Sequence, residues 1–319
     1  MFRLPDHWVW DSWVVDDGQQ YHLFFLQAPR SLGDPQLRHA AAKIGRATSL
    51  DLVNWKYHGI VLEPDPASWD VGALWTGSIV RGQDGLWRMF YTATNTRGHG
   101  LRDQCISVAE SADLATWRRV QDHPVIQVDS RWYQTLPEDA SASETWRDPF
   151  VYADSSGGWR MLITARAVGG DEHDDGVLGC ARSMDLLHWQ LEPPLTFPGA
   201  GFGQIEVSQV RIVDGVPLLV FTCHPQNQTP ERVSRYGRFC TWWVTAKSVD
   251  GPWDIAAARP FTAEPALFAA PLVHRRDKTW ALIGFRNFEP EALNTFDIID
   301  PIPVQVRDGA LVLRDAPEP

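Results

Sequence analysis

Short runs of β-branched and aromatic residues alternate with turn residues along the whole chain. Five of these runs share a strand-like apolar pattern, and they begin at Tyr21, Trp87, Trp159, Pro217 and Trp280. Most of them follow a hairpin turn, as at Asp17-Gly18 and Asp84-Gly85. No long segment with the period of an amphipathic helix competes with them. The pattern therefore predicts an all-β chain built from five similar units.

A second repeat indicates the size of each unit. The segment Ser-x-Asp-x-x-x-Trp, or a near variant, recurs at spacings of 62, 72 and 65 residues, beginning at Ser49, Ser111, Ser183 and Ser248. Such spacings are typical of propeller blades. We therefore predict a five-bladed β-propeller with four-stranded antiparallel blades around a central axial pocket. Between the blades we expect the tryptophans of this repeat to pack, namely Trp55, Trp117, Trp189 and Trp253.

A third set of runs marks the first strand of each blade. These runs open with Trp10, Trp75, Arg147, Ile205 and Ala269. First strands line the central channel of a propeller, so the residues that open them converge on one axial pocket. Three openings carry a carboxylate, and we expect these acids at the same register of their blades: Asp11, Asp148 and Glu206.

Three clustered carboxylates suit the cleavage of a glycosidic bond. One acid attacks the anomeric carbon or activates water, and a second, kept protonated by a raised pKa, donates a proton to the leaving oxygen. Trp10 and Trp75 beside these acids would supply flat faces for a sugar ring. Any one of these acids alone is as easily a turn or cap residue, and it is the set of three that favours a catalytic site.

Composition narrows the class of partner. The 319 residues carry 29 Lys+Arg against 40 Asp+Glu, a formal net charge of -11, and no basic stripe, which argues against nucleic acid. No apolar run approaches the roughly 20 residues of a membrane span, and no secretion signal is evident, so we expect a cytoplasmic location. The fifth unit ends near residue 319, so residues 1–319 are interpreted as a single catalytic domain without a C-terminal β-sandwich.

Cofactor and metal signals are weak. The four scattered cysteines have no metal-binding spacing and are expected to be free buried thiols: Cys105, Cys180, Cys223 and Cys240. The acidic segment 169–176 is interpreted as a solvated loop at the pocket rim, with a cation site left open as the alternative. We therefore expect no cofactor and no metal, and a small carbohydrate as the partner; the oligomeric state is left open.

Several motifs resemble a known clan of enzymes. Trp10-Asp11-Ser12-Trp13 resembles the nucleophile motif of the levansucrases and fructosyltransferases of glycoside hydrolase family 68. Residues 21–29 and 45–55 are similar to the invertases and inulinases of family 32, which shares a clan and a five-bladed fold with family 68. The resemblance extends from about Trp10 to about Val210 and includes three further motifs: Trp75-Thr76-Gly77-Ser78, Arg147-Asp148-Pro149 and Ile205-Glu206.

The resemblance implies a retaining reaction on a β-fructofuranoside, such as sucrose or a short fructooligosaccharide. Asp11 would be the nucleophile, Glu206 the acid/base and Asp148 the stabiliser of the transition state. Residues that follow the second strands of the last two blades are candidates for the leaving-group subsite or surface turns. They are Asn227, Gln228 and Asn287 and, as expected substrate contacts, His224 and Arg286. Including these two, the expected substrate-binding residues are Trp10, Gln27, Trp75, Thr76, Ser78, Arg147, Gln204, His224 and Arg286.

Two alternatives stay open at the level of sequence. One is an inverting α-L-arabinofuranosidase or β-xylosidase similar to family 43, in which Asp11 would be a general base instead of a nucleophile. The other is a non-catalytic propeller whose acids only bind sugar hydroxyls. The choice between hydrolysis and fructosyl transfer also stays open, because both pass through the same covalent intermediate.

Overall fold

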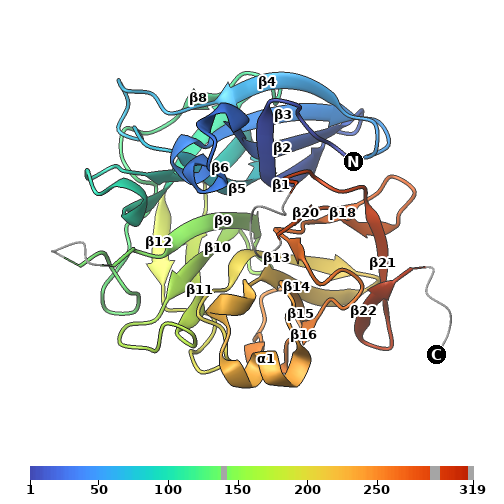
Figure 1. Ribbon diagram of the computed structural model, residues 1–319. Coiled ribbons are helices and arrows are strands. Elements are labelled where there is room, and N and C mark those ends of the chain that lie inside the picture. The colour runs from blue at the N-terminus through green and yellow to red at the C-terminus, as the bar shows by residue number, and fades with distance from the viewer. Residues whose placement is uncertain (138–141, 288–294, 315–319) are drawn as a thin grey trace.

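The computed structural model describes residues 1–137, 142–287 and 295–314. Its strands form five four-stranded antiparallel sheets arranged in a ring, as the blue-to-red sequence of blades in Figure 1 shows. Four of the sheets are meanders of consecutive strands, and in the fifth β20 intervenes in the chain between the paired strands β19 and β21. The predicted five-bladed β-propeller is therefore confirmed.

The strand bounds give the blades in order. Blade 1 holds β1 (His7–Asp16), β2 (Tyr21–Pro29), β3 (Lys43–Ser49) and β4 (Lys56–Leu62). Blade 2 holds β5 (Leu74–Arg81), β6 (Trp87–Thr94), β7 (Gln104–Ser111) and β8 (Arg118–Arg119). Blade 3 holds β9 (Trp146–Ala153), β10 (Trp159–Arg166), β11 (Gly176–Ser183) and β12 (Trp189–Glu192). Blade 4 holds β13 (Glu206–Val213), β14 (Val216–Thr222), β15 (Thr241–Thr245) and β16 (Arg259–Pro260). Blade 5 holds β18 (Leu272–His274), β19 (Trp280–Leu282), β21 (Ile302–Arg307) and β22 (Ala310–Leu313).

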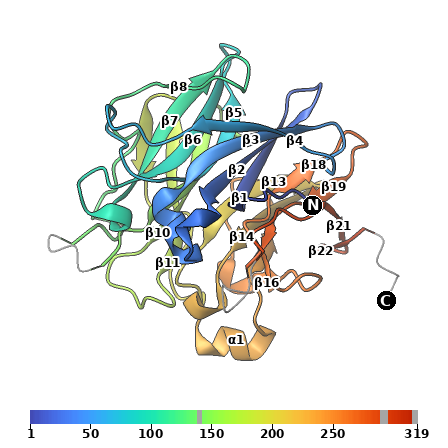
Figure 2. The same ribbon diagram turned by 45° about the horizontal axis from the view of Figure 1, so that its top comes forward.

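A few short elements lie outside the blades. β17 (Leu267–Phe268) pairs with β20 (Phe285–Arg286) beside blade 5. The helix α1 (Pro230–Tyr236) stands apart from the ring in Figure 2. The 3-10 helices are η1 (Arg30–Leu32), η2 (Pro35–Ala41), η3 (Gly100–Arg102), η4 (Pro225–Asn227) and η5 (Ile255–Ala257). None of the helices in the described part of the chain combines the length and the apolar character needed to cross a membrane.

The Ser-x-Asp repeat forms the turn between the third and fourth strands of a blade. In blade 1, Asp51 Oδ1 accepts hydrogen bonds from the backbone N–H groups of Val53 and Asn54, at 2.9 and 2.8 Å. Ser49 Oγ accepts another from the N–H of Leu52 at 2.9 Å. Short oxygen side chains are favoured in such turns because they satisfy backbone donors locally.

Aromatic side chains join neighbouring blades. Trp117 of blade 2 meets Phe24 of blade 1 edge to face at 5.7 Å, and Trp189 of blade 3 meets Phe90 of blade 2 at 5.4 Å. For these two tryptophans the expected packing between blades is confirmed.

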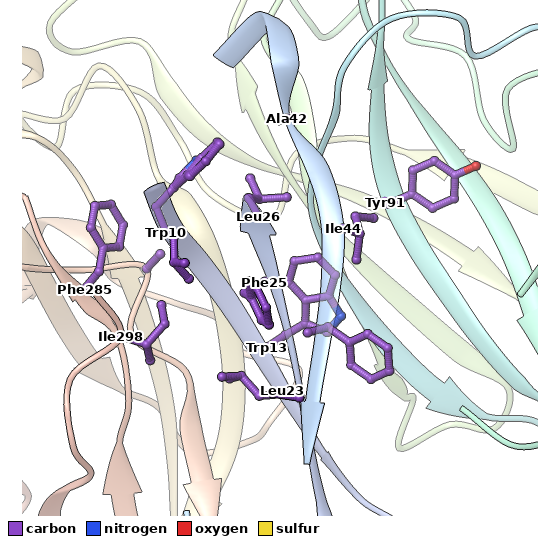
Figure 3. Close-up of a cluster of buried hydrophobic side chains, with 14 of the residues drawn as sticks. Trp10, Trp13, Leu23, Phe25, Leu26, Ala42, Ile44, Tyr91, Phe285 and Ile298 are labelled. Atoms are coloured by element: carbon purple, nitrogen blue, oxygen red, sulfur yellow. The ribbon is translucent and has the colours of Figure 1, made fainter. Parts of the chain in front are cut away.

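The core of blade 1 is buried on both faces, as Figure 3 shows. Trp13 lies on the side of Tyr91 from blade 2, whereas Trp10 lies on the side of Phe285 from β20. The N-terminal segment closes the ring, because Phe2 forms an isolated β-bridge with Ile298. A closed ring has short protected sheet edges and fixes the first strands around one axis.

Four first strands carry one extra residue near their start. The register of β1 with β2 shifts between Trp10 and Ser12, and the same shift occurs at the corresponding place in β5, β9 and β13. Three of these β-bulges hold a non-glycine residue at positive φ: Asp11 at 27°, Asp148 at 55° and Val207 at 47°. Such a conformation costs on the order of 1–3 kcal/mol and is concentrated at functional sites.

The pairing corrects the expected register of the three acids. In the last pair before each bulge, Trp10 of β1 lies opposite Leu26, Arg147 of β9 opposite Thr164, and Glu206 of β13 opposite Thr222. Glu206 therefore occupies the strand position of Trp10 and Arg147, which is one residue before the position of Asp11 and Asp148. The prediction of a common register was wrong because a bulge leaves no mark in the alternation of polar and apolar residues.

Candidate active site

The three carboxylates line one cavity of about 660 Å³. β1, β9 and β13 deliver Asp11, Asp148 and Glu206 to it from three different blades. The bulges re-aim the start of each strand, which lets residues from two adjacent register positions reach the same space. The structure thus brings together the three acids that the sequence singled out.

Asp11 is held by a neighbouring blade. The hydroxyl of Thr76 donates a hydrogen bond of 2.5 Å to Asp11 Oδ2. The pKa of Asp11 is raised to about 7, mainly by burial and also by the charges of Asp148 and Glu206, while the hydrogen bond from Thr76 and the charge of Arg38 oppose the rise. The carboxylate therefore ionises near neutral pH and presents its second oxygen for chemistry.

Asp148 is fixed on the side of blade 3. Its Oδ2 accepts a hydrogen bond of 3.0 Å from the Thr164 hydroxyl and lies 3.5 Å from Arg147 Nε. Its backbone N–H donates to Thr92 Oγ1 at 2.9 Å. Burial raises the pKa of Asp148, whereas Arg147 and Thr164 lower it. These bonds limit the side chain to one position, as expected of a group that holds ring hydroxyls.

Glu206 has the environment of a general acid. Arg147 Nη2 donates to Glu206 Oε1 at 2.7 Å and also to the Gln204 side-chain oxygen. Burial raises the pKa of Glu206 and the charge of Asp148 adds to the rise, while Arg147 lowers it. A raised pKa favours the protonated form of a carboxyl group, which is the form that can donate a proton to a leaving oxygen.

Blades 1 and 2 supply an aromatic wall. Trp10 and Trp75 both line the cavity, and the ring of His39 lies edge to face with each, at 6.2 and 6.3 Å. The Trp75 indole N–H donates to the His39 carbonyl at 2.8 Å. Burial, with the charges of Arg38 and Arg147, lowers the pKa of His39 to about 3. His39 is therefore neutral wherever the enzyme would work.

Sequence reasoning missed part of this wall. Gln36, Arg38 and His39 come from η2, the segment between the second and third strands of blade 1. Arg38 is buried, and its guanidinium lies 5.5 Å from the Trp10 ring centroid. η2 has no counterpart in the repeats, so no sequence signal pointed to it.

Polar side chains from the loops complete the cavity lining. His224 and Gln204, both expected at the site, line it together with residues that were not in the expected substrate-binding set. The latter include the amides Gln104, Gln134 and Gln226, and also Asn227 and Asn287, which the sequence offered as candidates for the leaving-group subsite. Glu172 of the acidic rim loop lines the cavity as well.

Three expected substrate-binding residues lie outside this cavity lining. Gln27 is buried, and its side-chain oxygen accepts a hydrogen bond of 2.9 Å from the Tyr57 hydroxyl. Ser78 Oγ accepts from the backbone N–H of Val151 at 3.0 Å. Arg286 pairs with Glu264 at 2.8 Å. In each case the structure shows a structural partner where the sequence suggested a sugar contact.

Metal-ligand geometry is defined for residues 1–137, 142–287 and 295–314. Within those ranges, no group of three or more His, Cys, Asp or Glu side chains is arranged to hold a metal ion. In the acidic loop, Asp171 accepts from the N–H of His173 at 2.9 Å and Asp174 accepts from Gly201. All four cysteines are free and buried, as expected.

A five-bladed propeller with three acids on its axis defines the class of glycoside-cleaving propellers. The family model of the glycosyl hydrolases family 32 N-terminal domain matches residues 8–248. The chain therefore belongs to glycosyl hydrolase family 32, and the expected clan of families 32 and 68 is confirmed.

Relatives with curated names fall in the same group. The chain is 31% identical over 189 residues to the sucrose-6-phosphate hydrolase of Bacillus subtilis, an alignment that covers 58% of this chain and 33% of that one. It is 23% identical over 295 residues to the extracellular sucrase of Zymomonas mobilis, covering 78% and 69%. The match thus spans about a third of the length of the first relative.

Solved structures share the fold. The inulosucrase from Halalkalicoccus jeotgali bound to kestose superposes with a TM-score of 0.77, covering 97% of this chain and 87% of that one. At 20% sequence identity this likeness shows the common propeller and no more.

Proposed function

We propose that the chain is a retaining enzyme that cleaves β-fructofuranosyl bonds. The observation that carries the proposal is the set of three acids in one cavity, Asp148 buried and Asp11 and Glu206 half-buried, each with a different environment. Asp11 attacks the anomeric carbon as the bond to the leaving oxygen breaks, and Glu206 gives its proton to that oxygen. Water or a sugar hydroxyl then loses a proton to Glu206 and displaces Asp11 from the fructosyl group.

Asp148 and Arg147 have supporting roles in this scheme. Asp148 Oδ2 is held by Thr164, which leaves its other oxygen for ring hydroxyls as positive charge develops. Arg147 contacts both Asp148 and Glu206 and links the stabiliser to the acid/base. Trp10 and Trp75 would face the sugar ring.

The lining of the cavity favours a neutral leaving group such as glucose over a phosphorylated one. Two of the arginines that line the cavity already form ion pairs with carboxylates of the protein. Arg147 pairs with Glu206, and Arg166 Nε lies 3.5 Å from Asp175 Oδ1. Arg38 is buried against Trp10 and acts on the nucleophile Asp11. The loop side chains His224, Gln226, Asn227 and Asn287 are uncharged or weakly basic, and such groups suit sugar hydroxyls. The substrate proposed is therefore sucrose or a short fructooligosaccharide.

A cytoplasmic location is part of the proposal. It is supported by the four cysteines, which are all free thiols as is usual in a reducing compartment. Fractionation of cells that produce the protein tests it, and recovery in the medium would contradict it.

The test compares substrates and variants. The purified protein is incubated with sucrose, sucrose 6-phosphate, 1-kestose and an aryl arabinofuranoside, and sugar products are separated by chromatography. Fructose release or transfer from sucrose is expected, and Asp11→Ala and Glu206→Gln should abolish it. Asp16→Asn is the matched control, because Asp16 lies on the same strand but is paired with Arg276 outside the cavity.

Each other outcome has a defined meaning. Turnover of the aryl arabinofuranoside alone would overturn the proposal in favour of the family 43-like alternative. Activity restricted to sucrose 6-phosphate would overturn the neutral substrate while keeping the reaction. Activity that persists in Asp11→Ala would remove Asp11 as the nucleophile.

A further inference from the structure

A second chamber of about 290 Å³ lies in the axial channel and adjoins the catalytic cavity. It shares the residues Thr76, Asp148 and Val207 with that cavity. Residues from the first strands of all five blades surround it. The proposed reaction gives this chamber no role.

Arg211 of β13 lines this chamber without an ionic partner. Among residues 1–137, 142–287 and 295–314, no carboxylate forms an ion pair with it, and burial alone lowers the pKa of Arg211 to about 10. Its Nη1 donates to the Val210 carbonyl at 3.1 Å, and its guanidinium carbon lies 4.8 Å from the Phe150 ring centroid. The Arg211 side chain is half-buried, and a guanidinium that is partly withdrawn from water and has no anion beside it is disfavoured, so an anion in the chamber would stabilise it.

Ser12 of β1 supplies a second polar group in the same chamber. Its side chain is 1% exposed, and its Oγ finds no hydrogen-bond partner within the described part of the chain. Buried hydroxyls are nearly always hydrogen-bonded in folded proteins. Ser12 and Arg211 come from blades 1 and 4, so the two groups reach the chamber from different sides of the ring.

The remaining lining residues of the chamber indicate what kind of ligand it can bind. Asp148 is the one carboxylate among the described lining residues, and its Oδ2 already accepts from the Thr164 hydroxyl. Apolar side chains make up much of the remaining wall, among them Val14, Phe150, Pro271 and Leu272. A ligand that fits this chamber must therefore combine an anionic group with an apolar part.

We propose that this chamber binds a small organic carboxylate. The carboxylate pairs with the Arg211 guanidinium and accepts a hydrogen bond from the Ser12 hydroxyl, while the apolar body packs on Phe150 and Leu272. Guanidinium–carboxylate pairs are strong because both charge and geometry match. The volume lies at the lower end of the range for small-ligand sites, roughly 300 Å³.

Benzoate is the probe, and its neutral isostere benzamide is the matched ligand control. Titration calorimetry and thermal unfolding are measured on the whole protein with each compound. Saturable binding of benzoate and at least tenfold weaker binding of benzamide are expected. Arg211→Met should weaken benzoate binding at least tenfold, and Ser12→Ala should weaken it by a smaller factor.

The control variant is Arg81→Met. Arg81 also lies over an aromatic ring, 5.4 Å from the Trp87 centroid, but it is outside the chamber lining, so this variant should bind benzoate as the wild type does. Without benzoate, Arg211→Met is expected to unfold at a temperature no lower than the wild type, because it loses no ionic partner.

Three results would overturn the proposal. Equal binding of benzoate and benzamide would remove the role of the charge. Retention of benzoate binding in Arg211→Met would place that binding elsewhere, including in the catalytic cavity. A wild type that shows no saturable binding, with an Arg211→Met variant that unfolds earlier, would assign Arg211 to packing on Phe150.

Discussion

The hydroxyl of Thr76 donates a hydrogen bond of 2.5 Å to Asp11 across the boundary between blades 2 and 1. The bond favours the ionised form of Asp11, whose pKa burial raises to about 7. In the proposed reaction Asp11 is the nucleophile and must be ionised, so this contact would set the lower end of the pH range of activity.

Replacing Thr76 by valine should raise the lowest pH at which the protein is active. The variant keeps the shape and loses the donor, so the pKa of Asp11 rises further, by about one pH unit for a hydrogen bond to a charged group. The acid limb of the kcat/KM profile with sucrose is expected to move up by that amount, with less change at high pH. Thr76→Ser retains a hydroxyl and should restore the wild-type profile. An unmoved acid limb in Thr76→Val would show that this bond does not control the nucleophile.

Replacing Arg147 by methionine should act on the opposite limb. Arg147 lowers the pKa of Glu206, so its loss raises that pKa and keeps the acid protonated to higher pH. The basic limb of kcat/KM is expected to move upward, while kcat falls by about 10²-fold or more because Asp148 and Glu206 lose their link. A pH series with Arg182→Met as control measures both effects, since Arg182 is outside the cavity lining. A lower kcat with an unshifted basic limb would show that Arg147 does not control the pKa of Glu206, and its role would then be to bind the substrate.

Neutralising Asp11 should stabilise the fold while it removes activity. The folded pKa of Asp11, about 7, lies above its ordinary value of 3.8, so the folded state holds a proton that the unfolded state releases. Protonated Asp11 is therefore compatible with the folded state, and the wild type is not penalised below about pH 4. As the pH rises through 7, ionisation of the carboxyl group lowers the free energy of unfolding. Asp11→Asn should therefore be more stable than the wild type at pH 8, by roughly 2 to 4 kcal/mol.

Urea unfolding at pH 8 and at pH 4 tests this stability difference. The gain of Asp11→Asn should shrink at pH 4, where the wild-type carboxyl is also neutral. Asp16→Asn should behave in the opposite way and lose stability at pH 8, because hydrogen bonding to Arg276 lowers the pKa of Asp16. Equal stability of Asp11→Asn and the wild type at both pH values would contradict the raised pKa.

Removing an aromatic contact between blades should cost stability. Phe90 is fully buried and meets Trp189 of the next blade edge to face at 5.4 Å. Phe90→Ala should lower the free energy of unfolding by about 3–5 kcal/mol through lost burial and the cavity left behind. Met184→Ala, at a side chain that is 77% exposed, is the control and should change it by less than about 0.5 kcal/mol. A small loss for Phe90→Ala would mean that the blades repack around the gap.

The parts of the molecule that repeat were predictable from the sequence, and the parts that interrupt the repeat were not. The Ser-x-Asp turns and the apolar second strands recur in the chain, and they predicted the five blades and the strand openings that hold Asp11 and Asp148. Arg38 and His39 belong to η2, whose residues are not part of the sequence repeats, so no internal comparison could expose them. The offset of Glu206 was missed because a bulge adds a residue without changing the composition of a strand.

The recurring bulge gives four of the five blades a similar backbone around the axis, while the side chains at that position differ. Asp11, Thr76, Asp148 and Val207 occupy the bulge position in four of the five blades, and the β17–β20 pair beside the fifth blade contributes the rings of Phe268 and Phe285 to the cavity. A sugar on the axis thus meets a pseudo-symmetric scaffold with an asymmetric distribution of charge. The side chains at the bulge positions would set the orientation of the sugar and therefore the bond that is broken. Single substitutions can exchange these side chains without changing the arrangement of the blades.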